Sequence, residues 1–491
     1  MSDQAASSGK EEPRLVRTFG LWSSVSIVVG GIIGSAIFMK PALMASQLGS
    51  PLILLAVWVL AGVVTLMGAL SNSEVAAMMP ETGGQYVFFQ KMYGDFIAFL
   101  FGWAGFAVFN TAGVASIAYV FAIYAEYFHP FPRFSTETEQ LFSLYLPGIG
   151  TFFPLENFGV KSLTIFLIGF LTWVNYRSVQ FGKNIQVVFT AMKVIAMGLL
   201  IVGLLGFGTG SWENVGRSST LIHHSGWMLV MAIIAATSGA FWGYDGWNNI
   251  TFIAGEIKDP QRNIPRSLLL GLLITISVYA LIVTAYCYVL PIDTIAHSPF
   301  VASDAANRAF GAAGGGIIAT LVLVATFGTT NGNILATARV SFAMAQEKRF
   351  FAWTGRVHPR NQTPGNALVL HGLWTSVLVL SGSFDMLTDM LVFVSWLFYG
   401  LSAAGIFVLR RKMPDQHRPY KVWGYPFVPG FFVLFTVFFL ISTLTSDIQN
   451  YLAGKTPLIN SLFGLFLTAL GIPLYFWFRW RSRHPATSGS L

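Results

Sequence analysis

The sequence predicts an all-α polytopic membrane protein of about twelve transmembrane helices. Of its 491 residues, 54% are hydrophobic and 10% are charged, and the mean hydropathy is +0.63. A soluble domain carries about 25% charged residues. Most residues of this chain are therefore not expected to be in contact with water. Apolar runs of about 20 residues, the length that crosses a bilayer, recur along its whole length.

Loops of different lengths separate these apolar segments, and 129–159 is the longest outside the cytoplasm. The segments at 94–128 and 313–346 are longer than a bilayer requires, so we expect them to tilt or to extend beyond it. The twelve predicted segments are 20–46, 52–78, 94–128, 160–178, 185–207, 227–255, 266–291, 313–346, 367–381, 385–410, 427–446 and 457–479.

The distribution of Lys and Arg between the loops predicts the orientation. With the N-terminus in the cytoplasm, 22 of the 29 Lys and Arg residues fall on the cytoplasmic side and six, Lys40 among them, on the other. Both tails, 1–17 and 481–491, are therefore expected in the cytoplasm, and the first is expected to be disordered. We expect no cleavable signal peptide, since residues 1–18 are polar and charged and the first apolar run is too long for one. The net charge of +8 follows from this bias and from anionic lipid, not from nucleic acid binding.

Several classes of site are disfavoured by what the chain lacks. Cys287 is the single cysteine, so no intramolecular disulfide can form. No Walker-type phosphate loop is present, so the chain has no ATPase of its own. His223 and His224 are adjacent but lack further ligands at metal spacing, and we expect neither a metal nor a cofactor. An enzyme is disfavoured because no paired carboxylates or nucleophile–base set stand out.

The first apolar segment weakens its own middle. In "VVGGIIGSAIFMKP" three glycines, Gly30, Gly31 and Gly34, fall within five positions. Each glycine costs about 1 kcal/mol relative to alanine inside a helix. The sixth segment repeats the pattern in "SGAFWGYDGWNN", where glycines alternate with aromatic and polar residues. Glycine-interrupted segments at matching positions of two five-helix sets are typical of transporters built from inverted repeats.

A break inside the membrane frees backbone groups, which survive only where they line a cavity or meet a ligand. The new helix N-terminus offers N–H donors and a positive dipole end, which suit a carboxylate. The preceding carbonyls suit an ammonium. The two breaks together therefore predict a site for the backbone of an α-amino acid. The alternative is that these glycines only allow helices to pack closely, as the Gly-x-x-x-Gly spacing of Gly30 and Gly34 permits.

Lys193 lies inside the fifth segment among uncharged neighbours. A cation near the bilayer centre costs about 2.5–3.5 kcal/mol, so it needs polar partners or a lowered pKa. The eighth segment offers such partners in "FGTTNGN", which contains Thr329 and Thr330. We expect Lys193 to tie the first and eighth segments together, as a bound sodium ion would. The alternative is that it extends towards the membrane surface.

With these features, the sequence resembles the L-type amino acid transporter family of the amino acid–polyamine–organocation superfamily. The resemblance covers about residues 15–480. Five motifs carry it in order: "GGIIGSAIF", "PETGGQYVF", "YDGWN", "GEIKDPQRNIPRSL" and "FGTTNGNILATAR".

The resemblance implies a fold of two inverted five-helix repeats, at 18–207 and 227–410, with two further helices within 411–480. It also implies a set of residues around the substrate. The carboxylate and amino group are expected at Ile32, Gly34, Ser35 and Ala36, and other substrate-facing positions at Trp242, Gly243, Asp245 and Asn248.

Two of the implied residues have special roles. Trp242 matches the bulky aromatic that gates the site from outside, and Lys193 matches the lysine that replaces sodium in sodium-independent members. Asp245 could instead pair with a cationic substrate, although a hydrogen-bonding role within the protein is favoured. Glu74, near the cytoplasmic end of its span, is expected to be either solvated or paired with an arginine, and a proton relay is the less favoured alternative.

The chain departs from the family in two places. Ala36 stands where the family usually has glycine, which places a methyl group near the site. The loop 129–159 lacks the cysteine that bonds a heavy subunit in eukaryotic members. We therefore expect a transporter without a disulfide-linked subunit, monomeric or weakly homo-oligomeric, in a bacterial inner membrane.

The resulting hypothesis is a sodium-independent carrier of neutral L-amino acids that works by alternating access and exchange. Proton symport remains open, since a desolvated lysine could itself carry the proton. A carrier of cationic amino acids or polyamines is a second alternative, which depends on Asp245. A sensor that binds but does not transport is a third, and the short tails disfavour it.

Overall fold

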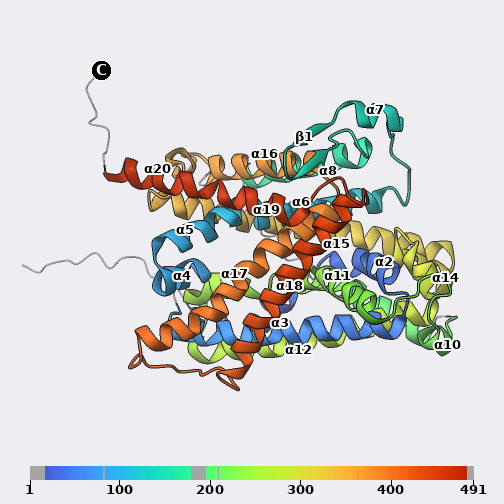
Figure 1. Cartoon of the computed structure of the whole chain (residues 1–491), viewed down its shortest axis with the longest axis horizontal. Coiled ribbons are helices and arrows are strands. Elements are labelled where there is room, and N and C mark those ends of the chain that lie inside the picture. The colour runs from blue at the N-terminus through green and yellow to red at the C-terminus, as the bar shows by residue number, and fades with distance from the viewer. Residues whose placement is uncertain (1–16, 81–82, 178–194, 208, 362, 484–491) are drawn as a thin grey trace, which may run out of the picture.

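The computed structural model describes residues 17–80, 83–177, 195–207, 209–361 and 363–483. Figure 1 shows a bundle of long helices, most of which run between two ends of the molecule. Within these residues nine helices are long and apolar enough to cross a membrane, and the bent pair α1–α2 makes up to ten. Shorter apolar helices span Ile195–Gly206 and α16 (Gly365–Ser381). Each predicted segment contains helix, and the predicted fold class is confirmed.

The two ends of the bundle are named here by their charge. The basic end, on the left in Figure 1, carries the three cations Arg410, Arg411 and Lys412 in the last turn of α17 (Phe384–Lys412). The far end, on the right, carries α10 (Trp212–Gly216) and α14 (Val301–Phe310).

Local sequence explains where the first helices begin and end. Gly49 adopts φ +62° and ends α2, and Pro51 begins α3, as left-handed glycine and N-terminal proline commonly do. The predicted segment 94–128 ends earlier, at Ala125, and contains a π-helical turn, a feature often found at functional sites. The elements are α1 (Leu21–Ile32), α2 (Ala36–Leu48), α3 (Pro51–Met78), α4 (Gln85–Tyr93), α5 (Asp95–Ala104), η1 (Gly105–Phe109), α6 (Asn110–Ala125) and α8 (Phe158–Arg177).

The second half of the chain repeats the alternation of broken and continuous helices. Ser383 begins α17 by accepting a hydrogen bond from the Met386 N–H, an N-cap of the usual kind. The bounds of the two inverted repeats stay a prediction. The further elements are α11 (Gly226–Tyr244), η2 (Trp247–Glu256), α12 (Pro260–Val289), α15 (Ala312–Gln346), η3 (Ala352–Gly355), α18 (Phe427–Leu452), α19 (Asn460–Ala469) and α20 (Gly471–Arg483).

Small elements close the far end. The loop that follows α6 forms α7 (Thr136–Leu141) and a hairpin of β1 (Leu144–Leu146) and β2 (Gly150–Phe152). The hairpin is fixed to the segment before α19, because the Thr151 N–H donates to the Pro457 carbonyl at 2.8 Å. The short helix α13 (Ile292–Ala296) precedes α14 and contacts α2.

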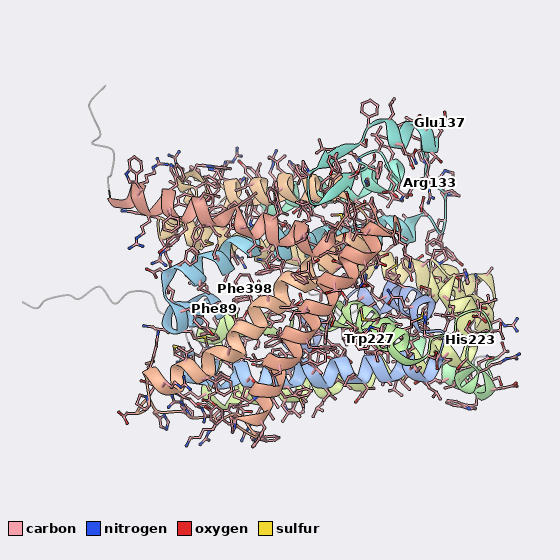
Figure 2. All side chains as sticks on the ribbon, viewed as in Figure 1. Phe89, Arg133, Glu137, His223, Trp227 and Phe398 are labelled. Atoms are coloured by element: carbon pink, nitrogen blue, oxygen red, sulfur yellow. The ribbon has the colours of Figure 1, made fainter. Side chains whose placement is uncertain are left out.

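An aromatic cluster joins α17 to its neighbours in the basic half of the bundle. Phe89 of α4 and Phe398 of α17 lie side by side in Figure 2, with ring centroids 5.9 Å apart. Phe101 of α5 packs edge-on against Phe398 at 5.4 Å, a favoured aromatic geometry. α17 is therefore held by aromatic packing on this side.

Candidate functional site

The first broken span has a helix start inside the protein core. α1 ends at Ile32 and α2 begins at Ala36, with a bend of 47° between them. Ser35 precedes α2, but its hydroxyl makes no capping bond and is buried without a hydrogen-bond partner among the described residues. The described residues also provide no acceptor for the backbone N–H groups of Ser35, Ala36 and Ile37. The break therefore presents unpaired donors of the kind that bind an anion.

The space beside Gly34 is open. A Cβ atom built on Gly34 would have only the Ile32 carbonyl oxygen, at 3.7 Å, as a neighbour within 4 Å. The methyl group of Ala36 lies on another side, 3.6 Å from where a Cβ of Gly243 would be. The methyl group that Ala36 adds therefore lies near Gly243 of the second broken span.

The second broken span touches the first at a pair of glycines. α11 ends at Tyr244, and Gly246, at φ +94°, precedes η2. A Cβ on Gly246 would lie 2.6 Å from the carbonyl oxygen of Gly31, closer than real Cβ atoms approach. Both the backbone angle and this contact require glycine at position 246. The close packing expected as the alternative explanation is therefore real here, but it operates between the two breaks.

Tyr279 of α12 connects the two breaks. Its buried hydroxyl donates to the carbonyl of Gly243 at 2.9 Å and to that of Ile32 at 3.1 Å. Because one hydroxyl proton is shared by these two carbonyl oxygens, each oxygen can still accept a further hydrogen bond. Trp58 packs edge-on against Tyr279, and its ring would lie 2.6 Å from a Cβ on Gly243, which explains that glycine by packing.

Asp245 and Asn248 are engaged by side chains of other helices. The Tyr399 hydroxyl of α17 donates to Asp245 Oδ1 at 2.6 Å. Asn72 of α3 donates to Asn248 Oδ1 at 2.8 Å and accepts from Ser402 Oγ at 2.9 Å. Asp245 thus has the hydrogen-bonding role within the protein that the sequence favoured.

Trp242 lies one helical turn before the second break, on the side of the far end. Its side chain is buried, and its ring meets Phe384 edge-on at 5.1 Å between centroids. The ammonium of Lys40 is 6.0 Å from the Trp242 ring and 4.9 Å from the Phe384 ring. Trp242 therefore lies between the second break and the far end, and its role as a gate stays a prediction.

Lys193 lies outside the described residues, so its contacts stay a prediction. Its two predicted partners are described. The hydroxyls of Thr329 and Thr330 each donate at 2.8 Å to the carbonyl four residues earlier, Ala325 and Thr326 respectively. Both hydroxyls keep acceptor lone pairs for a cation.

The broken spans are tied together at the basic end by main-chain bonds. Thr18 N–H donates to the Glu256 carbonyl at 2.9 Å, and Lys258 N–H donates to the Phe19 carbonyl at 2.8 Å. These bonds form a short parallel bridge between the segments before α1 and after η2. The two broken spans are therefore joined at the basic end by main-chain bonds.

Ion pairs hold α17 near both ends. Glu74 of α3 accepts two hydrogen bonds from Arg410, at 2.9 and 2.7 Å, and its side chain is buried, so of the two expected states it is paired with an arginine and not solvated. At the far end Lys40 of α2 binds Asp385 Oδ1 at 2.7 Å. This contact was not predicted from the sequence, although a lysine between an apolar run and Pro41 was a possible signal. The sequence contains no comparable signal for the contacts that Tyr279, Tyr399 and Asn72 make.

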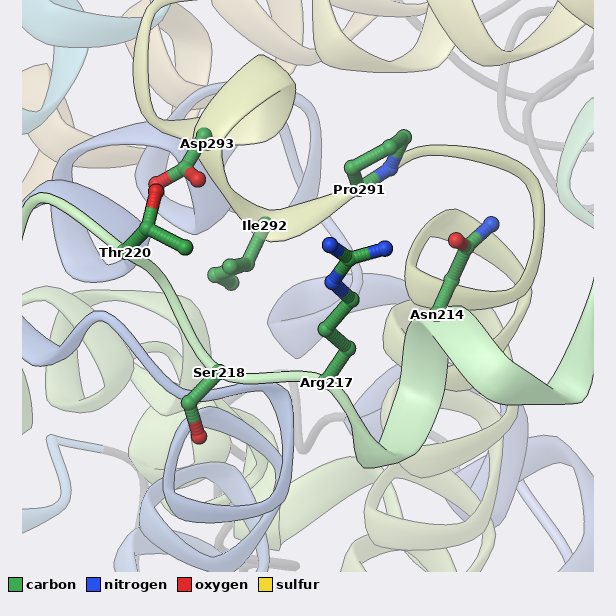
Figure 3. Close-up of a pocket in the computed structure, with 7 residues that line it drawn as sticks. All are labelled: Asn214, Arg217, Ser218, Thr220, Pro291, Ile292 and Asp293. Atoms are coloured by element: carbon green, nitrogen blue, oxygen red, sulfur yellow. The ribbon is translucent and has the colours of Figure 1, made fainter.

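A shallow pocket at the far end is separate from this site. Figure 3 shows it between α10, the loop after it and α13, with Arg217 and Asn214 on one side and Asp293 on the other. None of the residues at the two breaks lines it. Within the described residues no group of three or more His, Cys, Asp or Glu side chains is placed to hold a metal ion.

Comparisons with known proteins identify the family of this chain. The family model for amino acid permeases matches residues 19–467. The serine/threonine exchanger SteT of Bacillus subtilis (strain 168) is 29% identical over 469 residues, which cover 95% of this chain and 98% of the relative. The large neutral amino acids transporter small subunit 2 of Mus musculus is 30% identical over 96% of this chain and 82% of the relative.

A third relative is the b(0,+)-type amino acid transporter 1 of Homo sapiens, which is 28% identical over 93% of this chain and 89% of its own length. The resemblance to the L-type transporters is thereby confirmed, and with it a transporter family rather than an enzyme family. The chain is a multi-pass integral membrane protein that belongs to the amino acid permease family.

Proposed function

We propose that this protein is a sodium-independent exchanger of neutral L-amino acids that works by alternating access. The observation that carries the proposal is the N-terminus of α2, where the Ser35 hydroxyl and three backbone N–H groups lack partners among the described residues. A buried unpaired polar group is costly, so such a cluster suits a site that a ligand completes. The relatives, a serine/threonine exchanger and a large neutral amino acids transporter subunit among them, favour an amino acid as that ligand.

The substrate carboxylate would bind the N–H groups of Ser35 and Ala36 and the Ser35 hydroxyl, beside the open space at Gly34. Its ammonium would bind the carbonyls of Ile32 and Gly243, which share the single proton of Tyr279. Charge complementarity supports this orientation, because the helix N-terminus is positive and the helix C-termini are negative.

A neutral side chain is favoured by the state of Asp245. Its Oδ1 accepts a short hydrogen bond from Tyr399, so this carboxylate has a partner within the protein. Asn248 is likewise paired with Asn72. Both residues would shape the pocket through these contacts. A cationic amino acid or a polyamine is the second candidate, because Asp245 would be the acid to receive it.

During the transport cycle, the contacts at the two ends of the bundle would break and form again in turn. We assign the basic end to the cytoplasm from the bias of Lys and Arg, and the far end to the outside. Trp242 would close the outer path over the bound substrate. The main-chain bridge between Phe19 and Ile257 would close the inner path. Lys193, with Thr329 and Thr330, would replace the sodium ion and make coupling to sodium unnecessary.

The chain would act without a disulfide-linked subunit. Cys287 is its single cysteine and is buried in α12, and the far-end loop 129–159 contains none. We therefore propose a monomer or a weak homo-oligomer, located in a bacterial inner membrane with both termini in the cytoplasm.

Transport into liposomes tests the proposal. Purified protein is reconstituted into liposomes with or without a load of unlabelled amino acids, and radiolabelled alanine, leucine, arginine and putrescine are offered outside at two pH values. Uptake of alanine or leucine only into loaded liposomes is the expected result. Uptake of arginine or putrescine alone would contradict the neutral substrate, and pH-dependent uptake into empty liposomes would replace exchange by proton symport.

Ser35→Ala, with Ser24→Ala as its control, tests the site itself. Ser24 is also buried in the first span, but its hydroxyl donates to the Gly20 carbonyl of its own helix at 2.9 Å. Loss of one hydrogen bond to a bound substrate predicts a rise in KM of up to about tenfold for Ser35→Ala. An unchanged KM, with normal expression, would remove Ser35 from the site.

A further inference from the structure

The first two turns of α17 carry two carboxylates on one face. Asp385 and Asp389 are four residues apart, so both side chains project from the same side of the helix. Each binds one of the two broken spans. Asp385 binds Lys40 of α2, and Asp389 Oδ1 accepts from Ser238 Oγ of α11 at 3.2 Å.

The contact with α2 is a buried cation with a half-buried acid. Lys40 is 1% exposed, whereas the side chain of Asp385 is 50% exposed. The Lys40 ammonium also donates to the Thr388 hydroxyl at 2.7 Å, one position before Asp389. Three α17 residues, Asp385, Thr388 and Asp389, therefore face the two spans that must move.

The contact with α11 lies one turn from Trp242. Ser238 precedes Trp242 by four residues, so both lie on the same face of α11. Trp242 in turn packs against Phe384, the first residue of α17. A Cβ on Gly239 would touch the Lys40 side chain at 3.4 Å, so α2 and α11 approach each other closely here. Trp242, the aromatic lid of the proposed gate, is thus surrounded by the polar contacts that fix both broken spans to α17.

We propose that Asp385 and Asp389 together form the latch of the far-end gate, with one carboxylate holding each broken span. They are positioning residues, since they act on the lid and not on the substrate. The inference rests on the proposed alternating access, because only a gate that opens needs a latch. α2 and α11 cannot move away from α17 unless the Lys40–Asp385 pair and the Ser238–Asp389 bond are both broken.

The geometry suits repeated opening. When α2 withdraws, Asp385 is already half exposed to solvent and gains water at little cost. When the pair separates, the Lys40 ammonium is hydrated again, and this hydration offsets part of the free energy lost with the ion pair. A fully buried pair would open less readily.

Thiol labelling measures the latch without measuring transport. Cys287, the single and buried cysteine, is replaced by alanine, and Ser35→Cys places a reporter at the first break. Intact cells are then exposed to a membrane-impermeant maleimide, which reaches the reporter only through an open outer gate. Lys40→Met and Asp385→Asn are expected to raise the labelling rate about tenfold, and Asp389→Asn less, because its bond involves a single hydroxyl.

A second buried lysine gives the matched control. Lys161 is also nearly unexposed, but it donates to the carbonyls of Phe153, at 2.8 Å, Pro154 and Leu380, and these lie on neither broken span. Lys161→Met is expected to label at the parent rate. The charge-swapped pair Lys40→Asp with Asp385→Lys is expected to return labelling towards the parent rate, which a merely structural role would not predict.

The outcomes separate the latch from the proposed function. Parent-rate labelling of both Lys40→Met and Asp385→Asn, or equal acceleration by Lys161→Met, overturns the latch. If the unsubstituted protein exchanges amino acids in liposomes while the latch substitutions leave the labelling rate unchanged, only the latch is overturned. If labelling responds as expected but no amino acid is exchanged, the gate stands and the proposed function fails.

Discussion

The two ends of α17 bind their neighbours through ion pairs of different construction. At the basic end the acid is buried: Glu74 is 1% exposed, binds Arg410 through two hydrogen bonds and lies 3.4 Å from Arg418. It also accepts from the Val422 N–H at 2.9 Å. At the far end the cation is buried and its acid, Asp385, is half exposed.

This difference indicates that the ion pair at the basic end is a permanent contact and that the pair at the far end can break and form again. A buried charge whose hydrogen bonds are all made holds its surroundings rigidly, and removing one partner is costly. Glu74 therefore anchors α3, α17 and the segment after α17 as one unit. In the proposed cycle the inner path would open elsewhere, at the main-chain bridge between Phe19 and Ile257.

The largest effect is expected from Glu74→Gln. The substitution leaves Arg410 and Arg418 without their acid and should cost about 3–5 kcal/mol of stability. The melting temperature of the purified protein in detergent measures it. A change no larger than that of the far-end variants would contradict the comparison.

Tyr399→Phe tests the middle of α17, between the two ends. Asp245 would lose the hydroxyl that donates to it at 2.6 Å, and the expected cost is about 1.5–3 kcal/mol, typical of a hydrogen bond to a charged group. The same melting experiment measures stability, and arginine uptake measures whether the freed carboxylate now accepts a cation. A stable variant with an unchanged substrate range would show that Asp245 does not depend on Tyr399.

Lys40→Met should destabilise the protein less than Glu74→Gln does. The acid it leaves behind, Asp385, is half exposed and can be hydrated, so we expect about 1–2 kcal/mol. Lys40→Arg, which keeps the charge, serves as the control in the same melting series. A loss as large as that of Glu74→Gln would mean that both ends are permanent anchors.

Ser238→Ala is expected to give the smallest effect. It removes one hydrogen bond of 3.2 Å to Asp389, worth about 0.5–1.5 kcal/mol. Thr237→Val in the neighbouring position is the control, because that hydroxyl bonds within its own helix at 2.6 Å. Combined with Lys40→Met, Ser238→Ala should act additively on stability but more than additively on outer-gate labelling.

Much of the site could be predicted because its signals are local. Glycines that weaken an apolar helix mark a break wherever the helix packs, so both breaks were identified from short stretches of sequence, and the resemblance to the family then pointed to Ser35 and Trp242. The position of Glu74 near a helix end allowed either solvent or an arginine as its partner, and it did not indicate which arginine. Asp245 was placed at the second break, yet its donor, Tyr399, lies 154 residues away and carries no mark in the sequence.

The sequence by itself determined the membrane class, the helical segments, the two breaks and the family, because hydropathy and glycine placement act on each segment separately. The tertiary structure decided which groups meet. Tyr279 bridges the breaks, Asn72 engages Asn248, and Lys40 finds Asp385 at a separation of 345 residues. Such contacts depend on how helices cross and rotate, and an apolar helix that is buried on most sides leaves no sequence pattern to fix its rotation.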